Sequence, residues 1–478
     1  MEITNKKQIT SNHMVSFKQS QFREKELSDR VTISDERSSE YDINAQKLLD
    51  MAKKKDMKPA AEKHIYSLNL DDYMIPANHG RVAHMCLTFD GYDTKRNYVN
   101  AMKTFISKMP EAKFTVLTCN KSDRNYLQEQ VNSWGKKGII ENPERVNIIN
   151  TGKNLSIWAQ DSTLVIGNKV VEQDRTWFPG SDDRAVAGEI ADADPSLEYK
   201  RLEGIYIDGG NQLATDDTLF VGSDAVKFML QDMKPYPSVI RKVVNFFKGK
   251  EDNPKFSEKY EKLINELHIE NTADISKEDL CTLMMEKTFP HQKIVIVGHN
   301  GEQPAFHIDM AMTPIGKIDP ETSRPVITVG DPSMAVDILT KLKKKNPDKY
   351  SKYEKEIRSK VDSPASHPLD SLIDSVTDDL QENFDSLAKK FESDGYKIER
   401  VPYLGSSDTE GVPWLTYNNS VIDGDNIFIP NFNIPELDNV GNGIYKKYGY
   451  EPVPVDMTSI SSMMGAINCI TKVLERVY

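Results

Sequence analysis

The chain has 478 residues, of which 38% are hydrophobic, and a formal net charge of -12, so it can build a large core. This acidic balance argues against a nucleic-acid partner, which needs a basic face, and does not exclude a cationic substrate. No apolar run approaches the ~20 residues that a membrane-spanning helix needs. The first residues lack the apolar core of a secretory signal, which predicts a cytoplasmic protein, with export by a signal-independent route as the alternative.

The chain divides into two regions that differ in composition and in hydrophobic pattern. Residues 1–65 are polar and mixed in charge, and they predict a loose N-terminal extension. From residue 66 onward, short apolar runs alternate with helical patterns, which predicts an α/β domain over 66–478. The strands and helices expected first are a strand at 81–90, a helix at 94–109, a strand at 112–120, a helix at 124–138 and a strand at 145–152.

Farther along, β-rich runs occur in pairs separated by turn residues. The turns are expected at Gly167-Asn168, Asp216-Asp217 and Asp423-Gly424. A unit of strand, turn, strand, helix and strand therefore recurs, although too loosely to be a sequence repeat.

Two segments interrupt this recurrence. Residues of about 224–290 and 333–395 are rich in charged helix formers, and their apolar spacing predicts helical insertions. Charged outer faces are ordinary for helices packed on a rim, and the alternative is a subdomain that binds a protein partner.

Four cysteines lie far apart, at Cys86, Cys119, Cys281 and Cys469. They form no CxxC pair and no zinc spacing, which predicts neither a disulfide framework nor a metal site and fits a reducing compartment. Unpaired cysteine is usually a buried core residue. Cys469 needs further evidence before it can be considered a nucleophile.

That evidence comes from four short stretches: "WAQD" at 158–161, "DGGN" at 208–211, "FHIDM" at 306–310 and "NCIT" at 468–471. Each alone reads as a turn or a packed strand end. In "FHIDM", strand alternation would place His307 and Asp309 on one face, where a histidine beside a carboxylate can act as a general acid and base. A distant cysteine can meet such a histidine in space.

The ordered set of motifs resembles the guanidine-modifying (pentein) superfamily, within it the agmatine deiminases and the protein-arginine deiminases. The resemblance covers about residues 70–478 without the two insertions. It implies a five-bladed α/β propeller around a polar channel. It also implies a hydrolase that converts a guanidinium into a ureido group and ammonia, without a cofactor or metal.

The resemblance further implies roles for the residues of the motifs. Cys469 matches the nucleophile, His307 the acid and base, and Asp208 the residue that orients His307. The positions that match substrate-binding residues are Asp161, Asp309, Trp158 and Asn211. A pair of carboxylates suits a planar guanidinium because it can accept the N–H donors on both sides.

Three positions depart from the family pattern. Asn468 stands where these deiminases usually have His, Asp208 where they have Glu, and Gln160 where agmatine deiminases have Arg. Gln160 favours the protein-arginine type. The expected function is deimination of a small, agmatine-like guanidine. The alternatives are modification of arginine in a protein, as a secreted effector would do, and a catalytically weak pentein that serves as a binding module. A homo-oligomer is also expected from the resemblance.

Overall fold

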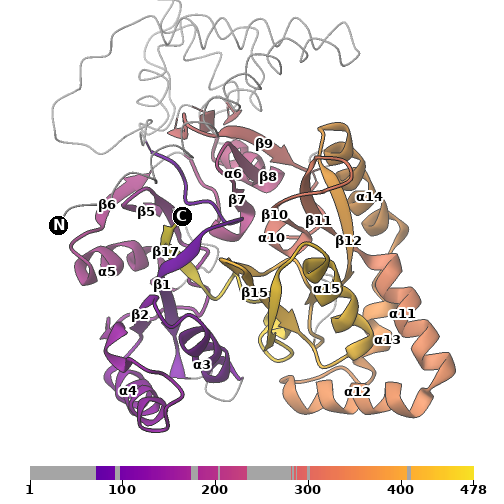
Figure 1. Cartoon of the computed structure of the whole chain (residues 1–478), viewed down its shortest axis with the longest axis horizontal. Coiled ribbons are helices and arrows are strands. Elements are labelled where there is room, and N and C mark those ends of the chain that lie inside the picture. The colour runs from indigo at the N-terminus through magenta and orange to yellow at the C-terminus, as the bar shows by residue number, and fades with distance from the viewer. Residues whose placement is uncertain are drawn as a thin grey trace, which may run out of the picture.

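The computed structural model describes residues 72–91, 97–173, 181–202, 205–233, 281–282, 285–286, 288–298, 302–405 and 411–478. The expected N-terminal extension at 1–65 and most of the insertion expected at 224–290 lie outside these ranges. Within them the protein is an α/β structure whose strands form five separate mixed sheets. Figure 1 shows the sheets following one another around the molecule in chain order.

The first sheet contains both the first and the last strand of the described chain. In spatial order its strands are β17 (Lys472–Val477), β1 (Arg81–Phe89), β2 (Lys113–Thr118) and β3 (Val146–Asn150). β17 runs antiparallel to β1, and β1 runs parallel to β2. The C-terminal segment is therefore a structural member of the N-terminal sheet.

The other four sheets repeat this pairing. The second contains β4 (Thr163–Ile166), β5 (Lys169–Gln173) and β6 (Glu198–Leu202), and the third β7 (Gln212–Ala214), β8 (Thr218–Gly222) and β9 (Lys293–Val297). The fourth contains β10 (Met312–Ile318), β11 (Pro325–Asp331), β12 (Lys397–Leu404) and β13 (Leu415–Thr416). The fifth contains β14 (Val421–Asp423), β15 (Asn426–Asn431) and β16 (Glu451–Asp456).

In every sheet an antiparallel pair is followed by a parallel pair. The parallel pairs need a crossover, because a tight turn cannot join strands that run in the same direction. Helices lie in these crossovers: α3 (Tyr98–Lys108), α5 (Val186–Ala193), α6 (Ser223–Met233) and α15 (Pro435–Lys447). α4 (Lys121–Lys136) joins β2 to β3. The recurrent unit expected from the sequence is therefore present four times as continuous chain. The first sheet has the same pairing without the turn, because β17 and β1 lie at opposite ends of the described chain.

The tight turns lie where the sequence predicts them. The β4–β5 turn contains Gly167 at φ 57°, and the β14–β15 turn contains Gly424 at φ 60°. A positive φ is costly for residues with a Cβ, so glycine suits both turns. The turn between β7 and β8 contains Asp216 and Asp217, also as expected.

The insertion expected at 333–395 is helical. It consists of α11 (Pro332–Lys345), α12 (Pro347–Lys360), α13 (Pro368–Asp374) and α14 (Asp378–Ser393), between β11 and β12. α14 buries Phe384, Leu387 and Phe391 on one face, and its N-terminus is capped by Thr377, which accepts from the Leu380 amide. These helices are drawn on the outer side of the fourth sheet in Figure 1.

The main hydrophobic core joins the first, fourth and fifth sheets to their helices. Cys469 and its neighbours Ile467 and Ile470 belong to this core, which fixes the backbone on both sides of the thiol. Among the described residues, no helix combines the length and apolar character required to cross a membrane.

Candidate active site

The fold brings one short segment from each of the five units to a common place. Each segment lies just before an edge strand that pairs antiparallel with its neighbour: Asp161 before β4, Asp208 before β7, Asp309 before β10, Asn419 before β14 and Cys469 before β17. Hydrogen bonds and ion pairs described below connect these segments. Because equivalent positions of repeated units meet here, residues scattered over some three hundred positions of the chain become neighbours.

The four sequence motifs are joined directly by hydrogen bonds. The Gln160 amide donates to the Cys469 carbonyl (3.1 Å), and the Gln160 side chain donates to the Gly209 carbonyl (2.9 Å). Asn211 accepts from the Ile308 amide (3.3 Å), and Asn468 Nδ2 donates to Asp309 Oδ2 (2.8 Å). The motifs therefore form one connected site, with their mutual positions fixed mainly by amide groups.

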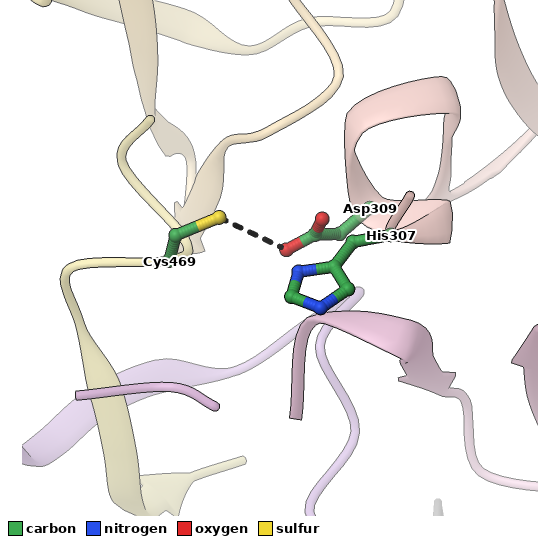
Figure 2. A group of neighbouring side chains, drawn as sticks. All are labelled: His307, Asp309 and Cys469. Atoms are coloured by element: carbon green, nitrogen blue, oxygen red, sulfur yellow. Dashed lines mark hydrogen bonds between the residues drawn. The ribbon is translucent and has the colours of Figure 1, made fainter. Parts of the chain in front are cut away.

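The segment "FHIDM" is not a strand, contrary to the expectation from its alternation. His307 has an extended backbone and precedes a single helical turn, α10 (Ile308–Ala311). The helical turn places Asp309 near Cys469 while the imidazole of His307 lies alongside (Figure 2). Apolar alternation over so few residues cannot distinguish a strand from one helical turn, which explains the error.

The two glycines of "DGGN" are required by close approach. A Cβ on Gly209 would lie 1.7 Å from the Gln160 carbonyl oxygen, and a Cβ on Gly210 would lie 2.4 Å from His307 Nδ1. Real Cβ atoms are not found at such distances. The motif thus provides a surface without side chains against which the imidazole packs.

The imidazole lies between two carboxylates. His307 Nε2 is 3.2 Å from Asp208 Oδ1, and its Nδ1 is 3.9 Å from Asp161 Oδ1. Tyr206 donates to the other oxygen of Asp208 (2.9 Å). Burial lowers the pKa of His307, but the charges of Asp208, Asp161 and Asp309 outweigh this effect and raise it to about 10. The histidine is therefore an imidazolium, a proton donor, at neutral pH.

The thiol of Cys469 is buried beside Asp309. Its Sγ is 3.8 Å from Asp309 Oδ2 (Figure 2). The same sulfur accepts from Asn419 Nδ2 at 3.3 Å. Ligand atoms of His307, Asp309 and Cys469 all lie within 4.8 Å of one another. Burial raises the pKa of Cys469 well above its usual range, and the charges of Asp309 and Asp161 raise it further. The thiol is therefore protonated at neutral pH in the unliganded protein.

Two buried carboxylates have unused acceptor capacity. Asp161 and Asp309 are 6% and 1% exposed, and each has one buried side-chain oxygen that accepts no hydrogen bond from any described residue. Burial raises the pKa of both groups, that of Asp309 to about 6. A buried carboxylate oxygen without a donor is costly, so this pair is arranged for a ligand that supplies N–H donors and positive charge.

A cavity adjoins one of these carboxylates, Asp309. Its wall includes Gln160, Asp309, Asn468 and Lys472, and it has about 50 Å³ of open space. One buried water needs ~10–15 Å³, so the cavity admits a small head group with several heavy atoms.

Two of the expected substrate-binding residues, Trp158 and Asn211, contact other segments of the protein. Trp158 packs against Gly465, where a Cβ would lie 2.2 Å from its ring. Asn211 accepts from Gln303 (2.9 Å) and from the Ile308 amide, so it holds the backbone next to His307. Both side chains support the segments that carry the reactive groups.

Three residues of the site are missed by the sequence reasoning. Asn419, in "YNNS", accepts from the Asn468 amide (2.8 Å) and donates to the Cys469 thiol. Tyr206 bonds Asp208, and Lys472 lines the cavity. Asn419 occupies the repeated position before the first strand of its sheet, which is the signal that could have identified it.

Some side chains of the site are of types that can bind a metal ion. Asp161, Asp208 and His307 form one group of close ligand atoms, and His307, Asp309 and Cys469 form another. An imidazolium has no free lone pair, so either group would have to release the His307 proton before binding a metal. A third group, Glu354, His367 and Asp370, lies in the helical insertion.

Replacing Gly210 by alanine is expected to lower kcat by about 10²-fold, because the added methyl group displaces the imidazole and even ~1 Å misplacement has that cost. Gly188→Ala is the matched control, since a Cβ there meets nothing within 4 Å. Steady-state kinetics of both variants tests this, and equal activity in Gly210→Ala would contradict the close packing of His307 on Gly210.

No protein-family model matches the sequence, and no curated protein is similar to it. Solved structures with a similar course of the chain include an agmatine deiminase of C. jejuni, 12% identical, with 87% of this chain and 98% of that chain covered and a TM-score of 0.48. Another is an agmatine deiminase of Enterococcus faecalis, 12% identical, with 86% and 98% covered and a TM-score of 0.46. An amidinotransferase of Microseira wollei is 10% identical, with 84% and 97% covered and a TM-score of 0.36.

These are guanidine-modifying enzymes, the class that the sequence motifs resemble. With each TM-score below 0.5 and identities near one tenth, the similarity by itself gives no information about the chemistry of this chain.

Proposed function

We propose that the protein is a hydrolytic deiminase of a small guanidine, with Cys469 as nucleophile. The observation that supports this most is the pair of buried carboxylates, Asp161 and Asp309, each of which has a side-chain oxygen that accepts no hydrogen bond from the described residues, beside a thiol and an imidazolium. A guanidinium supplies planar, positively charged N–H donors to fill that space.

Binding prepares the nucleophile. The guanidinium charge offsets the carboxylates that keep the Cys469 thiol protonated, so the pKa of the thiol falls when the substrate enters. Substrate binding and thiolate formation are coupled in this proposal.

The covalent step joins Cys469 Sγ to the central guanidinium carbon. The C–N bond to one terminal nitrogen then breaks, and this nitrogen takes the proton of His307 and leaves as ammonia. The remaining thiouronium is attacked by water, which loses one proton to His307. The C–S bond then breaks, the sulfur takes the remaining hydroxyl proton to restore the free thiol, and the ureido product is released. The proton that the thiol lost on substrate binding converts the ammonia into ammonium. One guanidinium and one water yield one ureido compound and one ammonium ion.

The proposal includes the five-bladed propeller implied by the sequence resemblance. It is supported by the five repeated units and by the antiparallel pairing of the last strand, β17, with the first, β1. In this arrangement the site lies where the N-terminal ends of β4, β7, β10, β14 and β17 converge.

A small guanidine is favoured over an arginine in a protein because the residues around the thiol are buried: Cys469 and His307 are each 1% exposed.

The direct test is incubation with agmatine, free arginine and an arginyl peptide, with measurement of ammonia and of the ureido product. Equimolar formation from a small guanidine is the expected result. Absence of product from all three would contradict the proposed function, and product from the peptide alone would favour the protein-arginine alternative.

A further inference from the structure

The strand that follows the nucleophile carries two buried cations. In β17, Lys472 and Arg476 are 3% and 9% exposed, and Leu474 between them is also buried. Alternate residues of a strand share a face, so these side chains lie on one face, with Lys472 nearer to Cys469. Both cations line the cavity that also touches Asp309 and Asn468.

Lys472 has no direct partner in the described part of the chain, where no hydrogen bond or ion pair to its Nζ occurs. Burial lowers the pKa of Lys472 to about 8, while the charges of Asp161 and Asp208 act in the opposite direction. Burial of an ammonium without an ion-pair partner is unfavourable, and the longer-range attraction to Asp161 and Asp208 offsets this only in part.

Arg476 is held in place by neutral acceptors. Its Nη1 donates to the carbonyls of His79 (3.1 Å), Gly80 (3.0 Å) and Ile422 (2.7 Å), and no carboxylate of the described chain lies within 4.0 Å of it. Asp423 attracts this charge from beyond ion-pair distance, and the cavity has a carboxylate, Asp309, at one part of its wall and the two cations at another.

A cavity with this charge distribution can discriminate between guanidines by the charge of the group at the end opposite the guanidinium. A second ammonium, as in agmatine, would meet Lys472 in a medium of low dielectric, where like charges repel strongly. A carboxylate would give the buried ammonium the partner that it lacks. We propose that Lys472 is a specificity-determining residue that selects a guanidine carrying a carboxylate over one carrying an amine. This inference rests on the proposed deiminase function.

The test uses two probes of similar length, 4-guanidinobutyrate and agmatine, which differ in the charge of the terminal group. We expect the wild-type protein to prefer 4-guanidinobutyrate by at least about tenfold in kcat/KM, which corresponds to a single retained charge interaction. In Lys472→Met, a neutral variant of similar length, the preference should fall by about tenfold or more, mainly through a higher KM for 4-guanidinobutyrate.

The matched control is Lys352→Met, at a side chain that is 71% exposed, which removes the same formal charge from the surface and should leave the preference unchanged. Melting temperature shows whether Lys472→Met folds, and we expect it to rise because a buried charge is removed. A wild-type preference for agmatine, or a preference unchanged within twofold in Lys472→Met, would overturn the inference.

Calorimetric binding of the two probes to Cys469→Ala, with and without Lys472→Met, separates the two proposals. If the wild-type protein converts neither probe, the deiminase proposal fails, and the calorimetric preference still decides the role of Lys472. If both are converted equally in every variant, the deiminase stands and the selection by Lys472 is wrong.

Discussion

Replacement of Cys469 by alanine is expected to lower kcat for ammonia release by about 10⁴-fold or more, the largest effect of any single change. Every covalent step proposed here passes through its sulfur, and loss of the nucleophile in an enzyme of this kind removes nearly all turnover. The thiol lies in the main core, but alanine retains the backbone, so the variant should fold and bind a guanidine.

The other three cysteines provide controls for this result. Burial raises the pKa of Cys86 to about 12 and that of Cys119 to about 11, as it also raises that of Cys469, but neither of these two thiols belongs to a described group of close His, Asp and Cys ligand atoms. Alanine at Cys119, which is only partly buried, should leave kcat within twofold. Undiminished turnover in Cys469→Ala would exclude the proposed mechanism.

Replacement of Asp309 by asparagine is expected to reduce kcat/KM by about 10²–10³-fold. The change is isosteric, but it removes one of the two buried charges that would hold the guanidinium, and truncating one partner of a buried charge pair costs ~2–5 kcal/mol. Steady-state kinetics over a range of substrate concentrations measures the effect.

The pH dependence gives a second measure of Asp309. Its pKa is raised to about 6 by burial, so below pH 6 the free enzyme carries a neutral carboxyl that cannot pair with a cation. For the wild type, kcat/KM should therefore fall about tenfold per pH unit below 6. In Asp309→Asn the part of this acid limb that belongs to Asp309 should be lost, and a limb that remains would belong to Asp161, whose pKa burial also raises. A limb of unchanged position and slope would contradict the assignment to Asp309.

Asp309→Asn should also have an effect of opposite sign on the thiol. The charge of Asp309 helps to raise the pKa of Cys469, so its removal should increase the rate at which uncharged iodoacetamide alkylates Cys469 in the absence of substrate. Slower turnover combined with faster alkylation is not expected from a variant that is only misfolded.

Much of the fold could be predicted because it depends on local patterns. The strands and helices of residues 81–152 follow hydrophobic periodicity, and the β4–β5 and β14–β15 turns follow from Gly167 and Gly424, which adopt a positive φ. The helices of the insertion at 333–395 were equally predictable, because amphipathic spacing over many turns is a strong signal.

The geometry of the site was less accessible from sequence. The motifs indicated which residues belong together, but "FHIDM" is too short for periodicity to separate a strand from the helical turn that forms there. Asn419 and Lys472 lie outside the four motifs that the sequence singles out. Their proximity to Cys469 depends on the pairing of β17 with β1 and on the convergence of five units, which are long-range features.

The most direct test of the central claim is mass spectrometry of the protein after reaction with 2-chloroacetamidine, whose amidinium group resembles a guanidinium. We expect a single adduct on Cys469, which excess guanidine substrate prevents and which is strongly reduced in Asp309→Asn, although that variant reacts faster with iodoacetamide. Equal labelling of all four cysteines, or labelling of Cys469 that neither substrate nor Asp309→Asn affects, would contradict it.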